Sequence, residues 1–184
     1  MVAISTATTS GHSLALKADG TVWAWGLNIY GSLGDGTEVI RSVPVQIVEL
    51  TGVVSISTYG YHSIALKSDG TVWAWGRNVY GQLWDGTLTD RFSPVQVPAL
   101  EDVRSISTAI CHSLALKSDG TVWGWGSNQY TQLEADPKKS SILTPVQEKL
   151  FSPLRSRKSK RGPVKWGPFR TICGDRKRGI FSGR

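Results

Sequence analysis

The chain has 184 residues, of which 40% are hydrophobic and eight are tryptophan, enough apolar material for the packed core of one ordinary domain. Its net charge of +7 is uneven, because residues 1–150 carry ten basic and thirteen acidic residues, whereas residues 151–184 carry eleven basic residues and one aspartate. The sequence has neither a run of ~18 apolar residues nor a signal peptide, which excludes a membrane span and favours the cytoplasm by default.

A fifteen-residue sequence motif occurs three times in the first 150 residues. HSLALKADGTVWAWG begins at His12 and returns almost unchanged from His62 and from His112. Two runs of alternating apolar residues flank Asp-Gly, a dipeptide that tolerates the positive φ angles of a tight turn. Each copy of the motif therefore predicts a β-hairpin. With a two-residue loop, Leu16 lies opposite Trp23. A four-residue loop would change these cross-strand pairs but keep the alternation of side chains between the two faces of the hairpin.

Because strand side chains alternate between the two faces of a sheet, the two-residue loop predicts a bulky face and a small face. Stacking the bulky face of one repeat on the small face of the next would build a continuous core. The predicted bulky face holds His12, Leu14, Leu16, Trp23 and Trp25, and the predicted small face holds Ser13, Ala15, Lys17, Val22, Ala24 and Gly26.

The rest of each repeat supplies two further strands. Turn-rich segments follow the hairpins at 26–37, 76–87 and 126–137, then a Pro-Val-Gln strand, and short apolar pieces at Val53 and Val103 lead into the next histidine. About four short strands per repeat is the content of one propeller blade. We predict an all-β fold, a partial β-propeller of three four-stranded antiparallel blades at about 1–52, 53–102 and 103–150.

The repeated motif resembles the regulator of chromosome condensation repeat family, and its very regular sequence is closer to the bacterial members. The resemblance rests on the His-Ser-Leu-Ala-Leu, Asp-Gly, Trp-Gly, Asn and Gln-Leu-Gly elements. The resemblance implies blades of four antiparallel strands, commonly seven to a ring, that mostly bind proteins. Some members exchange guanine nucleotide on a small GTPase, and this activity is the alternative function. The sequence departs from the pattern at Tyr59 and Ala109 before the histidine, and at Trp84 and Glu134 after Gln-Leu.

Three blades do not close a propeller ring, which has at least about four blades. The open faces predict self-association, a partner that fills the gap, or a fragment of a longer array, and we favour the fragment.

Residues 151–184 contain no copy of the repeated motif and are predicted to be a disordered, basic tail. One interpretation is an arm that binds nucleic acid through phosphate contacts. The favoured alternative is a solvated or non-native terminus, and a nuclear address is a third. The candidate phosphate-binding residues are Arg155, Arg157, Lys158, Lys160 and Arg161.

No catalytic, metal-binding or cofactor-binding constellation is predicted. His12, His62 and His112 recur with the repeat and suggest structural histidines bonded to neighbouring backbone. Asp19 and its counterparts always precede Gly and belong to turns. Cys111 and His112 are neighbours in a strand, so their side chains point to opposite faces.

We therefore predict a non-enzymatic module that binds another protein. The candidate partner-binding residues are aromatic or arginine side chains of turns and loops, the types enriched in binding hot spots. They are Tyr59, Tyr61, Trp84, Arg91 and Phe92. An alternative for Trp84 is that it only fills space between blades.

Overall fold

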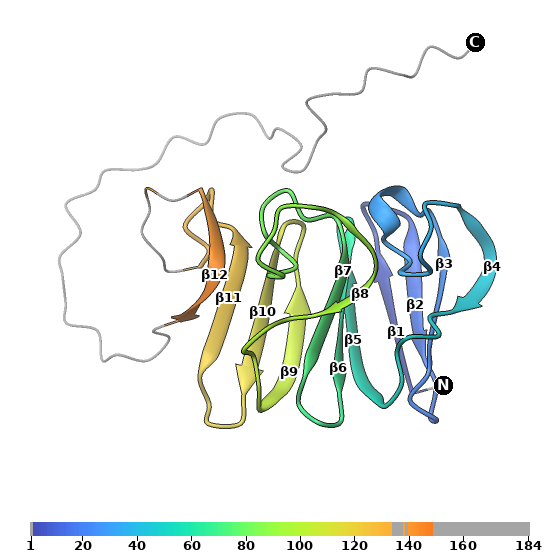
Figure 1. Cartoon of the computed structure of the whole chain (residues 1–184), viewed down its shortest axis with the longest axis horizontal. Helices are drawn as coiled ribbons and strands as arrows, with labels where there is room; N and C mark the ends of the chain where they lie inside the picture. Colours follow the sequence, from blue (N-terminus) through green and yellow to red (C-terminus); the bar gives the residue numbers. More distant parts are fainter. Residues whose placement is uncertain (1, 134–137, 139, 149–184) are drawn as a thin grey trace, which may run out of the picture. The chain divides into compact units, whose positions relative to one another are not determined.

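The computed structural model describes residues 2–133, 138 and 140–148, and this part of the chain forms three four-stranded antiparallel sheets (Figure 1). In every sheet the strands lie in chain order, so each sheet is one blade. Blade 1 consists of β1 (Ala3–Ala7), β2 (His12–Leu16), β3 (Val22–Gly26) and β4 (Arg41–Gln46). Blade 2 consists of β5 (Val53–Tyr59), β6 (His62–Lys67), β7 (Val72–Gly76) and β8 (Arg91–Gln96). Blade 3 consists of β9 (Val103–Thr108), β10 (His112–Lys117), β11 (Val122–Ser127) and β12 (Ser141–Glu148).

These blades confirm the predicted all-β fold of four-stranded antiparallel sheets. One 3-10 turn, η1 (Ile29–Gly31), precedes β4 and is the only helical element among the described residues. In the described part of the chain, no helix is long and apolar enough to cross a membrane. The predicted tail, residues 151–184, lies outside the described residues.

The predicted hairpin pairing was wrong, because the loop has three residues. The Lys17 amide donates to the Thr21 carbonyl oxygen, and the Gly20 amide donates to the Lys17 carbonyl oxygen, each at 3.0 Å. Gly20 takes a φ of 78°, the left-handed conformation that glycine adopts without strain. Asp19 accepts hydrogen bonds from the Thr21 amide at 3.0 Å and from its hydroxyl at 2.6 Å. A three-residue loop of this kind is the next most common after the two-residue turns.

The odd number of loop residues changes which side chains share a face. Leu16 lies opposite Val22, and Ser13 lies opposite Trp25. A register shift of one residue moves every side chain of the second strand to the other face. The predicted bulky and small faces are therefore not those of the structure.

Each blade instead has two faces that we name by their largest residues. The leucine face of blade 1 holds His12, Leu14, Leu16, Val22 and Ala24, and the tryptophan face holds Ile4, Ser13, Ala15, Trp23 and Trp25. The same register gives blades 2 and 3 the equivalent faces.

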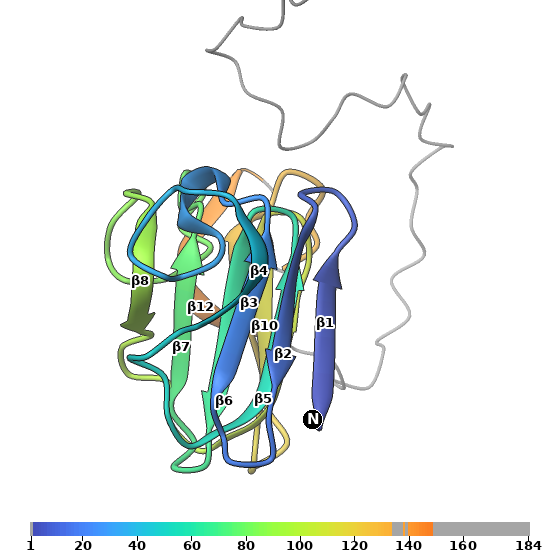
Figure 2. The same ribbon diagram turned by 90° about the vertical axis from the view of Figure 1, so that its right-hand side faces the viewer.

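The tryptophan face of each following blade packs on the leucine face of the blade before it. One buried cluster joins Leu14 and Leu16 of blade 1 to Trp75 of blade 2. A second joins Leu66 of blade 2 to Trp125 of blade 3. The prediction that successive repeats stack to build the core is confirmed, although the faces that meet differ from those predicted. Figure 2, turned by 90°, shows the strands of successive blades lying behind one another.

Candidate protein-binding rim

The loops at one end of the three blades form the candidate binding surface. The chain passes this end at the turns after the first strand of each blade and at the long loops after the third strand. We call this end the loop rim, and it lies at the top of Figure 1. Its described loop residues are 8–11, 27–40, 60–61, 77–90, 109–111, 128–133, 138 and 140, and we count with them the strand-end residues that border these loops, Tyr59, Arg91 and Phe92. The opposite end, the hairpin rim, consists of the described loop residues 17–21, 47–52, 68–71, 97–102 and 118–121.

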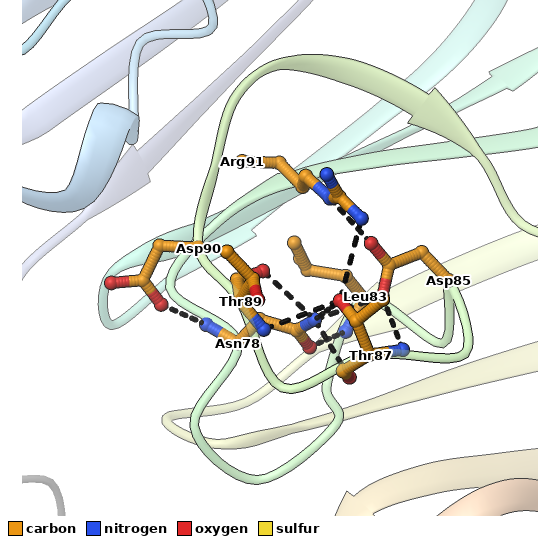
Figure 3. A network of polar contacts seen from close by, with 7 residues as sticks. All are labelled: Asn78, Leu83, Asp85, Thr87, Thr89, Asp90 and Arg91. Carbon is orange, nitrogen blue, oxygen red and sulfur yellow. Dashed lines mark hydrogen bonds and ion pairs between the residues drawn. The ribbon is translucent and has the colours of Figure 1, made fainter.

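A buried asparagine organises the long loop of blade 2. Asn78 is fully buried, and its Nδ2 donates to the Asp85 carboxylate at 3.0 Å. The same nitrogen donates to the carbonyl oxygens of Thr87 and Thr89, at 3.0 and 3.1 Å. The Oδ1 atom accepts a hydrogen bond from the Leu83 amide at 3.0 Å. Figure 3 shows how one side chain thereby connects both ends of the loop.

The same arrangement recurs in blade 1 and in part in blade 3. Asn28 donates to Asp35 at 3.1 Å and accepts from the Leu33 amide at 2.9 Å. Asn128 of blade 3 accepts from the Leu133 amide at 3.1 Å. Buried polar networks whose members are satisfied make a backbone rigid. The long loops are therefore held in defined conformations.

Arg91, a predicted partner-binding residue, holds the same loop from the start of β8. Its Nε donates to the Asp85 carboxylate at 2.5 Å. Burial raises the pKa of Asp85, but hydrogen bonds from Thr87 and Arg91 outweigh burial and keep the pKa below its ordinary value. In blade 1, Arg41 and Asp35 form the equivalent pair at 2.7 Å. The structure thus gives Arg91 a role within its own loop, and a role in partner binding stays a prediction.

Tyr61 lies in a cluster between blades 1 and 2. Its ring meets the ring of Tyr30 edge-on, with the centroids 5.3 Å apart. The Arg77 guanidinium lies 4.7 Å from the centroid of Tyr30 and 5.8 Å from that of Tyr61. Such cation–π contacts fix the positions of the rings. Tyr61 and Tyr59 are both half-buried, and Tyr59 ends β5 on the same rim.

Trp84 fills space between blades 2 and 3. Its ring centroid lies 5.8 Å from that of Trp125, and it packs against the buried cluster between these blades. The alternative prediction for Trp84 therefore describes its packing correctly.

Phe92 is the most exposed of the five candidate residues, with 40% of its surface accessible. It is the second residue of β8 and packs over Gly31 of η1, where a Cβ atom would collide with the ring. Leu143 takes the same place in blade 3 over Gly81, and is also exposed. At both junctions between blades, an apolar side chain of the following blade thus packs on the long loop of the preceding blade.

The sequence prediction missed a group of exposed apolar residues in the long loops. The signal that could have found them is the presence of large apolar side chains in turn-rich segments, two of them directly after the repeated asparagine. They are Ile29, Val39, Ile40, Val79, Leu88 and Tyr130.

The repeated histidines connect the blades below the rim. His12 lies 3.1 Å from the Ser63 hydroxyl of blade 2, measured from Nε2. The Thr58 hydroxyl of blade 2 lies nearer to the same nitrogen, at 2.5 Å. Because the Ser63 and Thr58 hydroxyls donate their own protons to the carbonyl oxygens of Ser32 and His62, Nε2 of His12 is the donor. Its Nδ1 accepts from the Ser10 hydroxyl at 2.7 Å. His62 reaches Ser113 of blade 3 at 3.0 Å. The predicted structural role is confirmed, but the partners are side-chain hydroxyls of the next blade and, for His12, of its own blade, in place of the expected backbone.

Burial keeps these histidines neutral. It lowers the pKa of His12 to about 4, and the pKa of His62 to about 3. Within residues 2–133, 138 and 140–148, no group of three His, Cys, Asp or Glu is placed to hold a metal ion. The candidate phosphate-binding residues Arg155, Arg157, Lys158, Lys160 and Arg161 lie outside the described residues.

The structure is similar to solved propellers. It matches human WBSCR16 with a TM-score of 0.70 and 25% identity, over 79% of this chain and 37% of that protein. It also matches yeast RCC1 (Prp20) in complex with Kap60, with a TM-score of 0.69 and 21% identity, over 80% of this chain and 36% of that protein. The chain thus spans little more than a third of these relatives. A search of curated proteins found no significant match.

Family models agree with the blades. One model of the regulator of chromosome condensation (RCC1) repeat matches residues 3–32, 53–82 and 103–132, each running from the first strand of a blade into its long loop. A second matches residues 19–66, 69–116 and 119–160, which is most of the chain. With three repeats of matching sequence and three blades of matching structure, the chain belongs to the regulator of chromosome condensation (RCC1) repeat family.

Proposed function

We propose that this chain is a non-enzymatic module that binds another protein through its loop rim. The observation that carries this proposal is the display of apolar side chains on rigid loops. Ile29 and Val79 are exposed directly after the buried Asn28 and Asn78. Exposed apolar groups favour association, and rigid loops lose little conformational entropy when a partner binds.

Similar proteins support a protein as the class of partner. Yeast Prp20 was crystallised in a complex with Kap60, and a second study describes its binding to Gsp1p and histones. These interactions belong to Prp20, of which this chain covers 36–37%. Guanine-nucleotide exchange on a small GTPase remains a prediction from family resemblance, because no residue of this chain has been matched to that activity.

A photo-crosslinking experiment tests the rim. Benzoylphenylalanine is placed at Phe92 or Val79 on the loop rim, and at Val48 or Asp69 on the hairpin rim as matched controls. In extract of the source cells, we expect the two loop-rim positions to give adducts of the same mass that the hairpin-rim positions do not give. Equal adducts at both rims would contradict the proposal.

The captured protein then allows a quantitative measurement. With the purified partner, Phe92→Ala and Val79→Ala should each weaken binding about 10-fold, the effect of a moderate hot spot. Val48→Ala should leave the affinity unchanged. Unaltered affinity in both loop-rim variants would remove the loop rim as the binding surface.

A further inference from the structure

The tryptophan face of blade 1 is open in the described part of the chain. Ile4 on this face is 66% exposed, whereas its counterpart Ile56 in blade 2 is 9% exposed. Trp25 is half-buried, whereas Trp75 and Trp125 are fully buried. Blade 1 therefore presents to solvent the surface that blades 2 and 3 use for packing.

Among the described residues, nothing covers the leucine face of blade 3 either. Leu114 and Leu116 are half-buried, whereas Ile64 and Leu66 at the same positions of blade 2 are buried. His112 is also half-buried, in contrast to its counterparts in blades 1 and 2.

The two junctions between blades show which contacts would cover these faces. Each junction contains a hydrogen bond between a histidine and a serine: His12 with Ser63, at 3.1 Å, and His62 with Ser113, at 3.0 Å. Each also contains a tryptophan indole that donates to a loop carbonyl oxygen. These pairs are Trp75 with Ser32, at 3.0 Å, and Trp125 with Gln82, at 2.8 Å.

The open faces hold the two halves of one more such junction. Blade 3 carries His112 and the Gln132 carbonyl, and blade 1 carries Ser13 and Trp25, at the positions that correspond to the established contacts. We propose that the tryptophan face of blade 1 binds the leucine face of blade 3 in a second copy of this chain. Trp25 then donates to Gln132 of that copy, and Ser13 bonds to its His112.

A second copy is the occupant that the structure specifies, because its surface already packs in this way twice within the chain. The area is of the order that a stable interface needs. Each buried aromatic ring covers about 150–250 Å², so faces of this composition remove several hundred Å² per copy, close to the ~800 Å² per partner of a stable interface.

The proposed contact joins two different faces, so it is heterologous. Each copy keeps one open face after a single contact, and association continues until a ring closes or an open chain grows. This distinguishes the proposal from a two-fold symmetric dimer, in which the same patch of both copies would meet.

Two substitutions test the proposal in the full chain. Trp25→Asp places a charge on the tryptophan face of blade 1, and Leu114→Asp places a charge on the leucine face of blade 3. Both sites are half-buried, so the variants should fold, which far-UV circular dichroism and cooperative unfolding check. Val48→Asp, at a 75% exposed site outside both faces, is the matched control.

Sedimentation velocity gives the result. The unchanged chain and the Val48→Asp variant should form dimers and larger species as concentration rises. Either face variant alone should associate at least about 30-fold more weakly, as expected for loss of a hot spot. An equimolar mixture of the two variants should form a 1:1 dimer and nothing larger, because one intact junction remains.

Three results would overturn the proposal. The unchanged chain could remain a monomer, which would mean that another segment or another protein covers these faces. The face variants could associate as the unchanged chain does. The mixed variants, each folded, could fail to form the 1:1 dimer.

Discussion

Trp75 donates its indole Nε1–H to the main-chain carbonyl oxygen of Ser32 in the preceding blade, at 3.0 Å. Ser63 donates its hydroxyl to the same oxygen at 3.1 Å. Two side chains of blade 2 therefore converge on one loop carbonyl of blade 1. A buried carbonyl with two donors is well satisfied, and removing either donor costs stability. The contact ties the loop rim of one blade to the sheet of the next.

Trp75→Phe should lower the free energy of unfolding by about 2–3 kcal/mol, because it removes a buried donor and leaves a void in a packed core. Trp25→Phe is the matched control, since Trp25 is half-buried on an open face. It should cost less than ~1 kcal/mol. Urea unfolding at high dilution, where association is negligible, measures both values. Equal losses would contradict the assignment of Trp75 to a blade junction.

A glycine at the end of each third strand should resist substitution. Gly76 has a φ of 97°, and a Cβ atom there would collide with the Tyr61 carbonyl oxygen and lie 2.8 Å from the His62 Cα. Gly86 also has a positive φ, of 80°, but its Cβ would meet nothing within 4 Å. Gly86→Ala should cost about 1–2 kcal/mol from backbone strain alone.

Gly76→Ala should cost clearly more than Gly86→Ala, because backbone atoms must also move apart. Thermal unfolding of the two variants side by side checks this order. Similar melting temperatures would show that the close approach of β7 to the turn before β6 relaxes without cost.

The buried asparagine should matter more to the long loop than the ion pair beside it. Asn78→Ala removes all the hydrogen bonds of the side-chain amide and leaves buried partners unsatisfied, so we expect a loss of about 2–4 kcal/mol. Arg91→Ala breaks an ion pair whose arginine is 36% exposed, and should cost about 1 kcal/mol or less. Urea unfolding gives the two values, and hydrogen exchange of residues 78–90 should accelerate only in the asparagine variant. A larger loss in Arg91→Ala would reverse this ranking.

The sequence predicted the number of blades, their strands and their stacking, because these follow from a repeat of 50 residues and from alternating apolar positions. It could not assign Trp23 and Trp25 to a face. Asp-Gly suits loops of more than one length, and a single residue in the loop decides which strand residues share a side.

The candidate binding site was predicted less completely, for a related reason. Arg91 and Trp84 were selected from their residue types, but their roles depend on how the chain folds, which brings Arg91 to Asp85 of the same loop and Trp84 to Trp125 of the next blade. The exposure of Ile29 and Val79 depends on how a buried asparagine folds the loop, which residue type alone does not reveal.

Stability should fall as the pH is lowered from 6.5 toward 4.5. His12 and His62 have folded pKa values of about 4 and about 3, below the ordinary 6.5. The unfolded chain then binds protons that the folded chain excludes, so each histidine stabilises the fold fully above pH 6.5 and loses that contribution as the pH falls toward the folded pKa. The loss over this range is about 2 kcal/mol per histidine.

Urea unfolding at pH 7.0, 6.0, 5.0 and 4.5 measures this decline. Asp35 and Asp85 contribute little in this window, because their folded pKa values are lowered and the stability they supply is lost mainly below their ordinary pKa of 3.8. Burial raises the pKa of Asp90, which opposes the decline slightly. His12→Gln should reduce the slope, since one of the three histidines whose pKa burial lowers is gone, while His62 and His112 keep their contributions. A slope unchanged by this substitution would mean that His12 does not carry the pH dependence, and that its ring is not held neutral against Ser63 in the next blade.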